Sequence, residues 1–164
     1  GEARGERGAH GCEEPLRGET RARLTVSKFW SITRISNNSK GDHPMAKYVD
    51  GFVLPVPKKN MNAYRRMARK ASEIWREHGA LEYRECVGDD LNVKVGLPFP
   101  RGIKVKPGET VVFSWIVFKS RSHRDRVNAN VMKDPRIQNM CDPKDMPCDC
   151  NRMLYGGFET IVES

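Results

Sequence analysis

Hydrophobic residues are concentrated after residue 45, in six segments whose spacing switches between the periods of strands and helices. Short runs rich in Val, Ile, Phe and Tyr predict strands, because such residues pack well on a pleated surface. In two longer segments the apolar residues recur every three or four positions, which is typical of amphipathic helices. The predicted strands span residues 47–54, 80–88, 109–118 and 152–162, and the predicted helices span residues 60–79 and about 120–133.

The first predicted helix places its apolar side chains on one face. Asn60 is a residue type that caps helix N-termini, and Gly79 suits the position just after a helix ends. The apolar face comprises Tyr64, Met67, Ala68, Ala71, Ile74 and Trp75.

Prolines indicate where two of these elements stop. Proline lacks the backbone N–H that a strand ladder needs, so Pro55 and Pro57 are expected to end the pairing of the first strand. Asp134-Pro135 is expected to stop the second helix near Lys133, after which a loop leads to the last strand.

The order of these segments is strand, helix, strand, strand, helix, strand. Two such βαβ halves with right-handed crossovers give an α+β, ferredoxin-like βαββαβ fold. Its four-stranded antiparallel sheet carries both helices on one face. Residues 45–164 are therefore expected to form one domain.

The third predicted strand, ETVVFSWIVF, is apolar on both faces. Two helices cover only one face of a sheet, so the other face requires a partner, and a second copy of the chain is the simplest one. The sequence therefore predicts a homodimer that pairs sheet to sheet. The residues expected on one face are Val111, Phe113, Trp115 and Val117, and those on the other are Val112, Ser114, Ile116 and Phe118.

Residues 1–44 are rich in Gly, Arg, Glu, Ser and Asn, and sustain neither period. Such a segment cannot bury enough surface to offset its chain entropy, and we expect a disordered extension. One hypothesis is that Met45 is the natural start and that the preceding residues come from upstream sequence. The alternative is a genuine disordered tail.

The net charge of +8 is distributed without a polybasic block, so we expect no specific nucleic-acid partner. No apolar run is long enough to span a membrane, and we expect no membrane partner. Five cysteines, with no secretory signal at the N-terminus of the sequence, favour a reducing compartment and a cytoplasmic location.

His123-Arg124-Asp125 and Asn130 have the H-R-D-x-x-x-x-N spacing of a protein-kinase catalytic loop. A kinase also needs a glycine-rich phosphate loop, a strand lysine and a D-F-G aspartate, and the sequence contains none of these. We interpret the match as coincidental and assign the stretch to the second helix, capped by Ser120 or Ser122.

Four stretches together resemble one known family: YVDGFVLPVP, HGALEYRECVGDD, ETVVFSWIVFKSRSHRDRVNANVMKDPR and RMLYGGFE. Residues 47–160 resemble the YbaA-like family of small bacterial proteins of unknown function. The resemblance implies a dimeric α/β barrel and supplies no reaction. Cys148 and Cys150 depart from the aromatic residue and glycine expected of the family, and residues 1–44 have no counterpart in it.

The leading hypothesis is a small, partly apolar ligand bound in a pocket between the sheet and the helices, with no cofactor. The alternatives are a cofactor-independent enzyme of monooxygenase or isomerase type, and a purely structural interaction module. Asp50, within the first strand, is interpreted as a structural hydrogen-bond acceptor before a general base. The candidate catalytic residues are His123, Asp50 and Tyr155, and the candidate ligand-binding residues are Ser114, Trp115, Arg124 and Asn128.

Three cysteines gather before the last strand, at Cys141, Cys148 and Cys150. Structural zinc sites combine paired cysteines with a fourth Cys or His, whereas this stretch has a single C-x-C and no nearby histidine. We therefore expect no metal here, and interpret Gly156-Gly157 in the last strand as a bulge or a close backbone approach.

Overall fold

The computed structural model describes residues 46–140 and 146–163 of the 164-residue chain. The expectations for residues 1–44, for Met45 and for Cys141 fall outside these residues. The strands are β1 Tyr48–Pro57, β2 Glu82–Val87, β3 Glu109–Phe118 and β4 Leu154–Glu159; the helices are α2 Met61–Glu77, α3 Phe99–Gly102, α4 Arg121–Val131 and α5 Pro135–Met140; and the 3-10 turns are η1 Lys58–Asn60 and η2 Cys150–Arg152.

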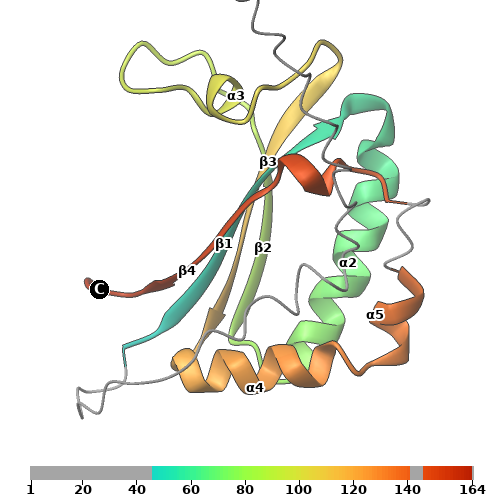
Figure 1. Ribbon diagram of the computed structural model, residues 1–164, viewed down its shortest axis with the longest axis vertical. Coiled ribbons are helices and arrows are strands. Elements are labelled where there is room, and N and C mark those ends of the chain that lie inside the picture. Colours follow the sequence, from blue (N-terminus) through green and yellow to red (C-terminus); the bar gives the residue numbers. More distant parts are fainter. Residues whose placement is uncertain (1–45, 141–145, 164) are drawn as a thin grey trace, which may run out of the picture.

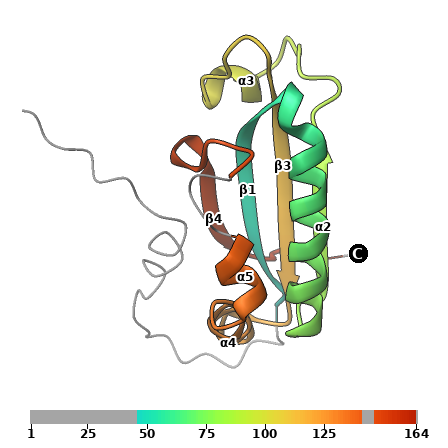
Figure 2. The ribbon, with the colours of Figure 1, turned by 90° about the vertical axis from the view of Figure 1, so that its right-hand side faces the viewer.

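The four strands form one antiparallel sheet in the order β2-β3-β1-β4. With α2 between β1 and β2, and α4 between β3 and β4, this order confirms the predicted ferredoxin-like βαββαβ fold. Figure 1 shows α2, α4 and α5 on the same side of the sheet. Figure 2 shows α2 running along the sheet, whereas α4 lies near one end of it.

β1 does not stop at its prolines, so the expectation that Pro55 and Pro57 end its pairing was wrong. The strand pairs with β3 as far as Pro57, opposite Glu109, but it pairs with β4 only as far as Val53. Beyond Val53, β1 is an edge strand on its β4 side, where a missing N–H costs no ladder hydrogen bond.

Helix α2 has the predicted position and the predicted face. Five of the six expected residues are buried, and Met67 packs partly buried against the same core. Gly79 follows the helix with a φ of 110°, a conformation that glycine adopts without steric cost. Asn60 holds the N-cap position, but its side chain donates to the Pro147 carbonyl oxygen over 3.1 Å instead of capping the helix.

Helix α4 contains the kinase-like stretch. Ser120 is its N-cap, because the Ser120 hydroxyl accepts a hydrogen bond from the backbone N–H of His123 over 3.2 Å. Val127 and Val131 are buried in the core. The stretch is therefore part of a capped helix and not a loop between strands, as expected.

The loop predicted after α4 contains a further helix, α5. Asp134-Pro135 ends one helix and begins the next, because the Asp134 carboxylate accepts from the backbone N–H of Arg136 over 2.9 Å. Proline is well suited to the first position of a helix, where its missing N–H needs no partner. The sequence pattern indicates only a stop signal at this dipeptide, and the helix that it starts was not predicted.

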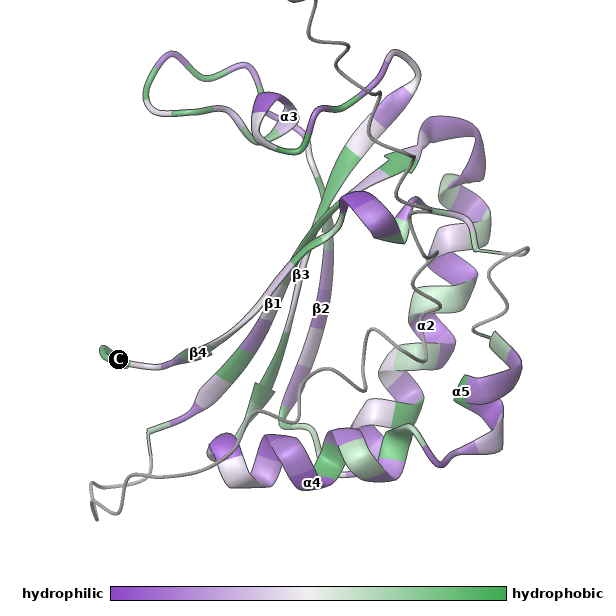
Figure 3. Cartoon of the chain, in the orientation of Figure 1, coloured by the Kyte–Doolittle hydropathy of each residue, from purple (hydrophilic) through white to green (hydrophobic). Residues whose placement is uncertain are grey.

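The two faces of the sheet differ in burial. On the helix side the core contains Val112, Ile116 and Phe118, and Ser114 is buried beside them, as the alternation in β3 predicted. On the other side Phe113 is 43% exposed. Figure 3 shows hydrophobic residues along β3.

No bulge occurs at Gly156-Gly157, because both residues keep regular pairing with β1. The glycines mark a close approach instead. A Cβ atom added at Gly157 would lie 2.5 Å from the Tyr48 hydroxyl oxygen. Within the described ranges, every helix is too short or too polar to cross a bilayer.

Candidate functional site

Asp50, Asn128 and Trp75 form a buried hydrogen-bond chain that joins three elements. The Asn128 amide donates from Nδ2 to Asp50 Oδ2 over 3.0 Å, and its Oδ1 accepts from the Trp75 indole N–H over 3.0 Å. Asp50 is in β1, Asn128 in α4 and Trp75 in α2. The Asp50 side chain is fully buried, so the hydrogen bond from Asn128 offsets part of the cost of removing the carboxyl group from water.

Arg124 brings a positive charge to the same carboxylate. Arg124 Nε lies 3.6 Å from Asp50 Oδ1, which is an ion pair too long for a hydrogen bond. The guanidinium also donates to the Tyr48 hydroxyl over 3.2 Å and lies 4.9 Å from the centre of that ring. Its exposed neighbour Asp125 approaches Arg124 Nε at 3.2 Å. Arg124 is therefore held on several sides.

Burial raises the pKa of Asp50, although Arg124, Asn128 and Tyr155 act in the opposite direction. Burial is the main cause that raises the pKa of Tyr155, and the negative charge of Asp50 raises it further. The Tyr155 ring stacks on Phe52 with the ring centres 4.8 Å apart. Asp50, Arg124, Asn128 and Tyr155, four of the seven predicted site residues, thus belong to one buried cluster.

The other three candidates lie elsewhere. Trp115 and Ser114 were both predicted to line a pocket between the sheet and the helices, but neighbouring residues of a strand point to opposite faces. Trp115 accordingly lies on the face without helices, 5.3 Å from the Phe113 ring centre, and donates to Glu82 over 3.1 Å. The His123 side chain binds the backbone just before α4, because its Nδ1 accepts a hydrogen bond from the Lys119 N–H over 3.2 Å.

The structure brings together a second polar cluster, whose central residue Glu85 is not among the predicted site residues. Glu85 of β2 accepts hydrogen bonds from the Tyr64 hydroxyl over 2.8 Å and from the Tyr83 hydroxyl over 2.9 Å. A hydrogen bond from Ser114 also stabilises the Glu85 carboxylate, while burial raises its pKa. The predicted residue Ser114 therefore belongs to this Glu85 cluster and not to the Asp50 cluster.

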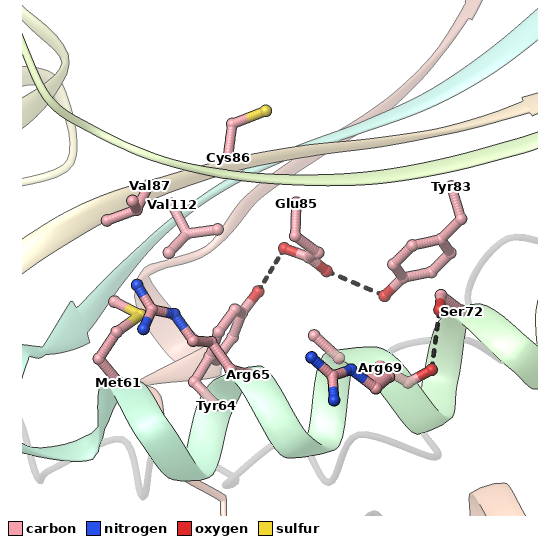
Figure 4. A pocket seen from close by; sticks show the side chains of 11 residues that line it. Met61, Tyr64, Arg65, Arg69, Ser72, Tyr83, Glu85, Cys86, Val87 and Val112 are labelled. Carbon is pink, nitrogen blue, oxygen red and sulfur yellow. Dashed lines mark hydrogen bonds between the residues drawn. The ribbon is translucent and has the colours of Figure 1, made fainter.

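Three residues of the Glu85 cluster, Glu85, Tyr64 and Tyr83, line a cleft of about 410 Å³ between α2 and β2. Figure 4 shows Glu85 and Tyr83 pointing from β2 toward the helix, and Cys86 pointing away from it. The apolar side chains Met61 and Val112 line the same cleft. The volume falls within the range of small-molecule pockets, so the cleft is large enough for a ligand.

A smaller cavity of about 120 Å³ adjoins the same three residues, Tyr64, Tyr83 and Glu85. The segment before β4 closes it with Cys148 and Cys150, whose Sγ atoms lie 3.7 Å apart. Both cysteines that the structure describes in this segment, Cys148 and Cys150, are free thiols.

Arg152 fixes the segment that carries these cysteines. Its guanidinium forms two hydrogen bonds with the Glu109 carboxylate, over 2.9 and 2.6 Å, and one with Asp149 over 2.8 Å. The hydrogen bonds from Arg152 are the main cause that lowers the pKa of Glu109 to about 2. Planar two-point contacts of this kind hold a segment in a defined position.

The sequence did contain a signal for Glu85. In the predicted strand 80–88, Tyr83, Glu85 and Val87 alternate with Glu82 and Arg84, so one face combines an acid with aromatic and aliphatic residues. The partner Tyr64 was assigned to the core face of α2 without regard to its hydroxyl. The contact spans 21 residues of sequence and depends on the helix packing over β2.

Among residues 46–140 and 146–163, no three His, Cys, Asp or Glu side chains are arranged to hold a metal ion. Neither the cleft nor the smaller cavity is lined by the four predicted residues of the Asp50 cluster, Asp50, Arg124, Asn128 and Tyr155. Its geometry is that of a buried polar link between strands and helices. The Glu85 cluster combines a carboxyl group with accessible space, which is what ligand binding requires.

Two solved structures align with most of this chain at low sequence identity. A dimeric ferredoxin-like protein from an uncultured marine organism aligns with a TM-score of 0.48 and 10% identity, covering 73% of this chain and 99% of that one. The de novo designed protein Foldit4 aligns with a TM-score of 0.36 and 11% identity, covering 71% and 99%. The fold assignment rests on strand order and connectivity.

Sequence relatives are much nearer. The chain is 44% identical over 117 residues to "Uncharacterized protein YbaA" of Escherichia coli strain K12, covering 71% of this chain and 98% of the relative. The protein of the same name from Shigella flexneri matches with the same identity and coverage. Residues 47–150 match the family described as "Protein of unknown function (DUF1428)". The chain therefore belongs to this family, as the resemblance to YbaA-like proteins predicted.

Proposed function

We propose that this protein binds a small, partly apolar molecule in the cleft between α2 and β2, with Glu85 as the polar anchor. The observation that carries the proposal is the position of the Glu85 carboxyl group. It faces the cleft from an edge strand and is held there by Tyr64 and Tyr83. A carboxyl group fixed by its neighbours loses little freedom when a ligand binds to it.

The lining of the cleft indicates the chemistry of the ligand. Met61, Val87 and Val112 offer apolar contact, and Glu85 offers an acceptor for a hydroxyl or amine group. Arg65 and Arg69 are exposed residues of α2 that line the same cleft. A ligand with an apolar body, a donor group at one end and an anionic group at the other fits this arrangement.

We further propose that the protein is a homodimer that pairs through the face of the sheet without helices. Exposed apolar side chains from two strands support this: Phe113 of β3 is 43% exposed, and Leu154 and Phe158 of β4 are 54% and 59% exposed. Val53 pairs with both Phe113 and Leu154, so the three side chains form a row across the sheet with Val53 in the middle. A second copy offers the same surface, and isologous pairing would bury both.

The enzyme hypothesis has weaker support. His123, Asp50 and Tyr155 were its candidate residues, and none of them lines the cleft or the smaller cavity. An enzyme of monooxygenase or isomerase type would need a reacting group beside bound substrate. The binding proposal needs only the Glu85 cleft, and the purely structural alternative needs only the sheet face.

Native mass spectrometry of protein purified under mild conditions tests the binding proposal. The expected result is a discrete extra mass on the wild-type protein that Val87→Trp lacks, because Val87 is half exposed at the cleft wall and an indole there would fill the space. Val93→Trp is the matched control, since Val93 is similarly exposed and does not line the cleft. Bare wild-type protein, or equal extra mass on all three, would contradict the proposal.

A further inference from the structure

The smaller cavity is unusually rich in sulfur. It lies between the sheet, α2 and the segment before β4, and has a volume of about 120 Å³. Two thiols and three thioethers line it, from Met67, Met146, Cys148, Cys150 and Met153. Methionine often fills gaps in cores, but thiols and thioethers are also the ligands that soft metal ions prefer.

The two thiols have the spacing of a metal-binding pair. Cys148 Sγ and Cys150 Sγ lie 3.7 Å apart. Two thiolates bound to one ion by bonds of about 2.3 Å lie roughly 3.8 to 4.0 Å apart at tetrahedral to trigonal angles. Arg152 anchors the segment that holds them, through Glu109 and Asp149, so the sulfur atoms need little rearrangement.

The polar lining of the cavity is also compatible with a cation. Glu85 faces it, and among its described lining residues there is no Lys, Arg or His. The larger cleft, which Glu85 also lines, differs because Arg65 and Arg69 line it. The smaller cavity therefore offers sulfur donors and a carboxyl group, without a basic side chain that would repel a cation.

We propose that Cys148 and Cys150 bind one soft monovalent cation, Cu(I), with thioether sulfur from the surrounding methionines completing the site. Harder divalent ions need more nitrogen or oxygen ligands, and the described residues offer no such group of three. Cu(I) is satisfied by few, soft ligands. This site shares Tyr64, Tyr83 and Glu85 with the ligand cleft of the proposed function, but its sulfur ligands do not line that cleft, so the copper proposal does not depend on the proposed function.

Anaerobic competition with a chromogenic Cu(I) chelator tests the proposal on the full chain. The wild-type protein is expected to withdraw one Cu(I) ion per chain from the chelator. Cys148→Ser and Cys150→Ser are each expected to weaken binding by at least about 100-fold, since even second-shell changes cost 10- to 100-fold. Cys86→Ser is the matched control, because Cys86 is an exposed thiol that does not line this cavity.

Cys12 and Cys141 remain in every variant, so Cu(I) held by them would persist when both Cys148 and Cys150 are serine. Undiminished binding by that double variant would overturn the proposal. Failure of the wild-type protein to compete with the chelator would also overturn it. Unchanged unfolding midpoints of the serine variants would establish that lost binding reflects lost ligands. X-ray absorption should show sulfur neighbours around the copper, and nitrogen or oxygen neighbours alone would contradict the assignment.

Discussion

The Asn128 amide donates to the Asp50 carboxylate over 3.0 Å and thereby joins α4 to the central strand β1. Because the same amide accepts from Trp75, a single side chain links three elements across the core. Asn128→Ala would remove one hydrogen bond from each of two buried groups. We expect it to lower the free energy of unfolding by about 2 to 3 kcal/mol, measured by chemical denaturation.

Asn130→Ala is the control for this variant, since Asn130 is an exposed residue of the same helix. It should change stability by less than about 0.5 kcal/mol. Equal effects of the two substitutions would show that the Asn128 bridge contributes nothing beyond its place in the helix.

Asp50 should give stability a characteristic dependence on pH. Burial raises its pKa above the ordinary value of 3.8. A group with a raised pKa stabilises the folded state fully below its unfolded pKa, and this contribution is lost as pH rises through the folded pKa. Relative to Asp50→Asn, the wild-type protein should therefore become less stable as pH rises above 3.8.

Chemical denaturation of both proteins from roughly pH 3 to pH 7 measures this difference. A difference that grows in favour of the wild type with rising pH would mean that Arg124 outweighs burial and lowers the pKa of Asp50.

The sheet face without helices should control the oligomeric state. Phe113→Lys with Phe158→Lys places two charges in the exposed apolar surface, where burying them against a second copy would be costly. Sedimentation velocity should show a dimer for the wild type and a monomer for this double variant. Val95→Lys, at a position 87% exposed in the loop before α3, should leave the dimer intact. A wild-type monomer at high protein concentration would refute dimerisation.

A side chain at position 157 should lower the stability of the fold. A Cβ there would lie 2.5 Å from the Tyr48 hydroxyl, which accepts a hydrogen bond from Arg124. We expect Gly157→Ala to destabilise the fold by about 1 to 3 kcal/mol in thermal or chemical denaturation, as overpacking does. Gly102→Ala is the control, because the nearest atom to its added Cβ would be 3.9 Å away. Similar stability of the two variants would show that Tyr48 moves aside freely.

The fold followed from sequence because its signals are local. The period of α2, the two-sided pattern of β3 and the Ser120 cap each depend on residues close in sequence. The errors came from context: Pro57 remained paired because β1 is an edge strand there, and Pro135 began a helix because Asp134 caps it.

The candidate site was harder to predict because its contacts are distant in sequence. Asp50 and Asn128 were both selected as polar residues in apolar segments, but their contact spans 78 positions. Glu85 resembled an ordinary strand acid until α2 placed Tyr64 against it. Trp115 was assigned to the pocket although strand alternation already put it on the other face.

Binding at the Glu85 cleft is tested at residue level by a small-molecule fragment screen followed by amide NMR. Fragments with an apolar body and a donor group should shift the amides of Tyr83, Glu85 and Val87 in the wild type. The same fragments should cause no such shifts in Val87→Trp, while Val93→Trp behaves like the wild type. Shifts confined to other parts of the chain, or unchanged in Val87→Trp, would contradict the proposal that this cleft is the binding site.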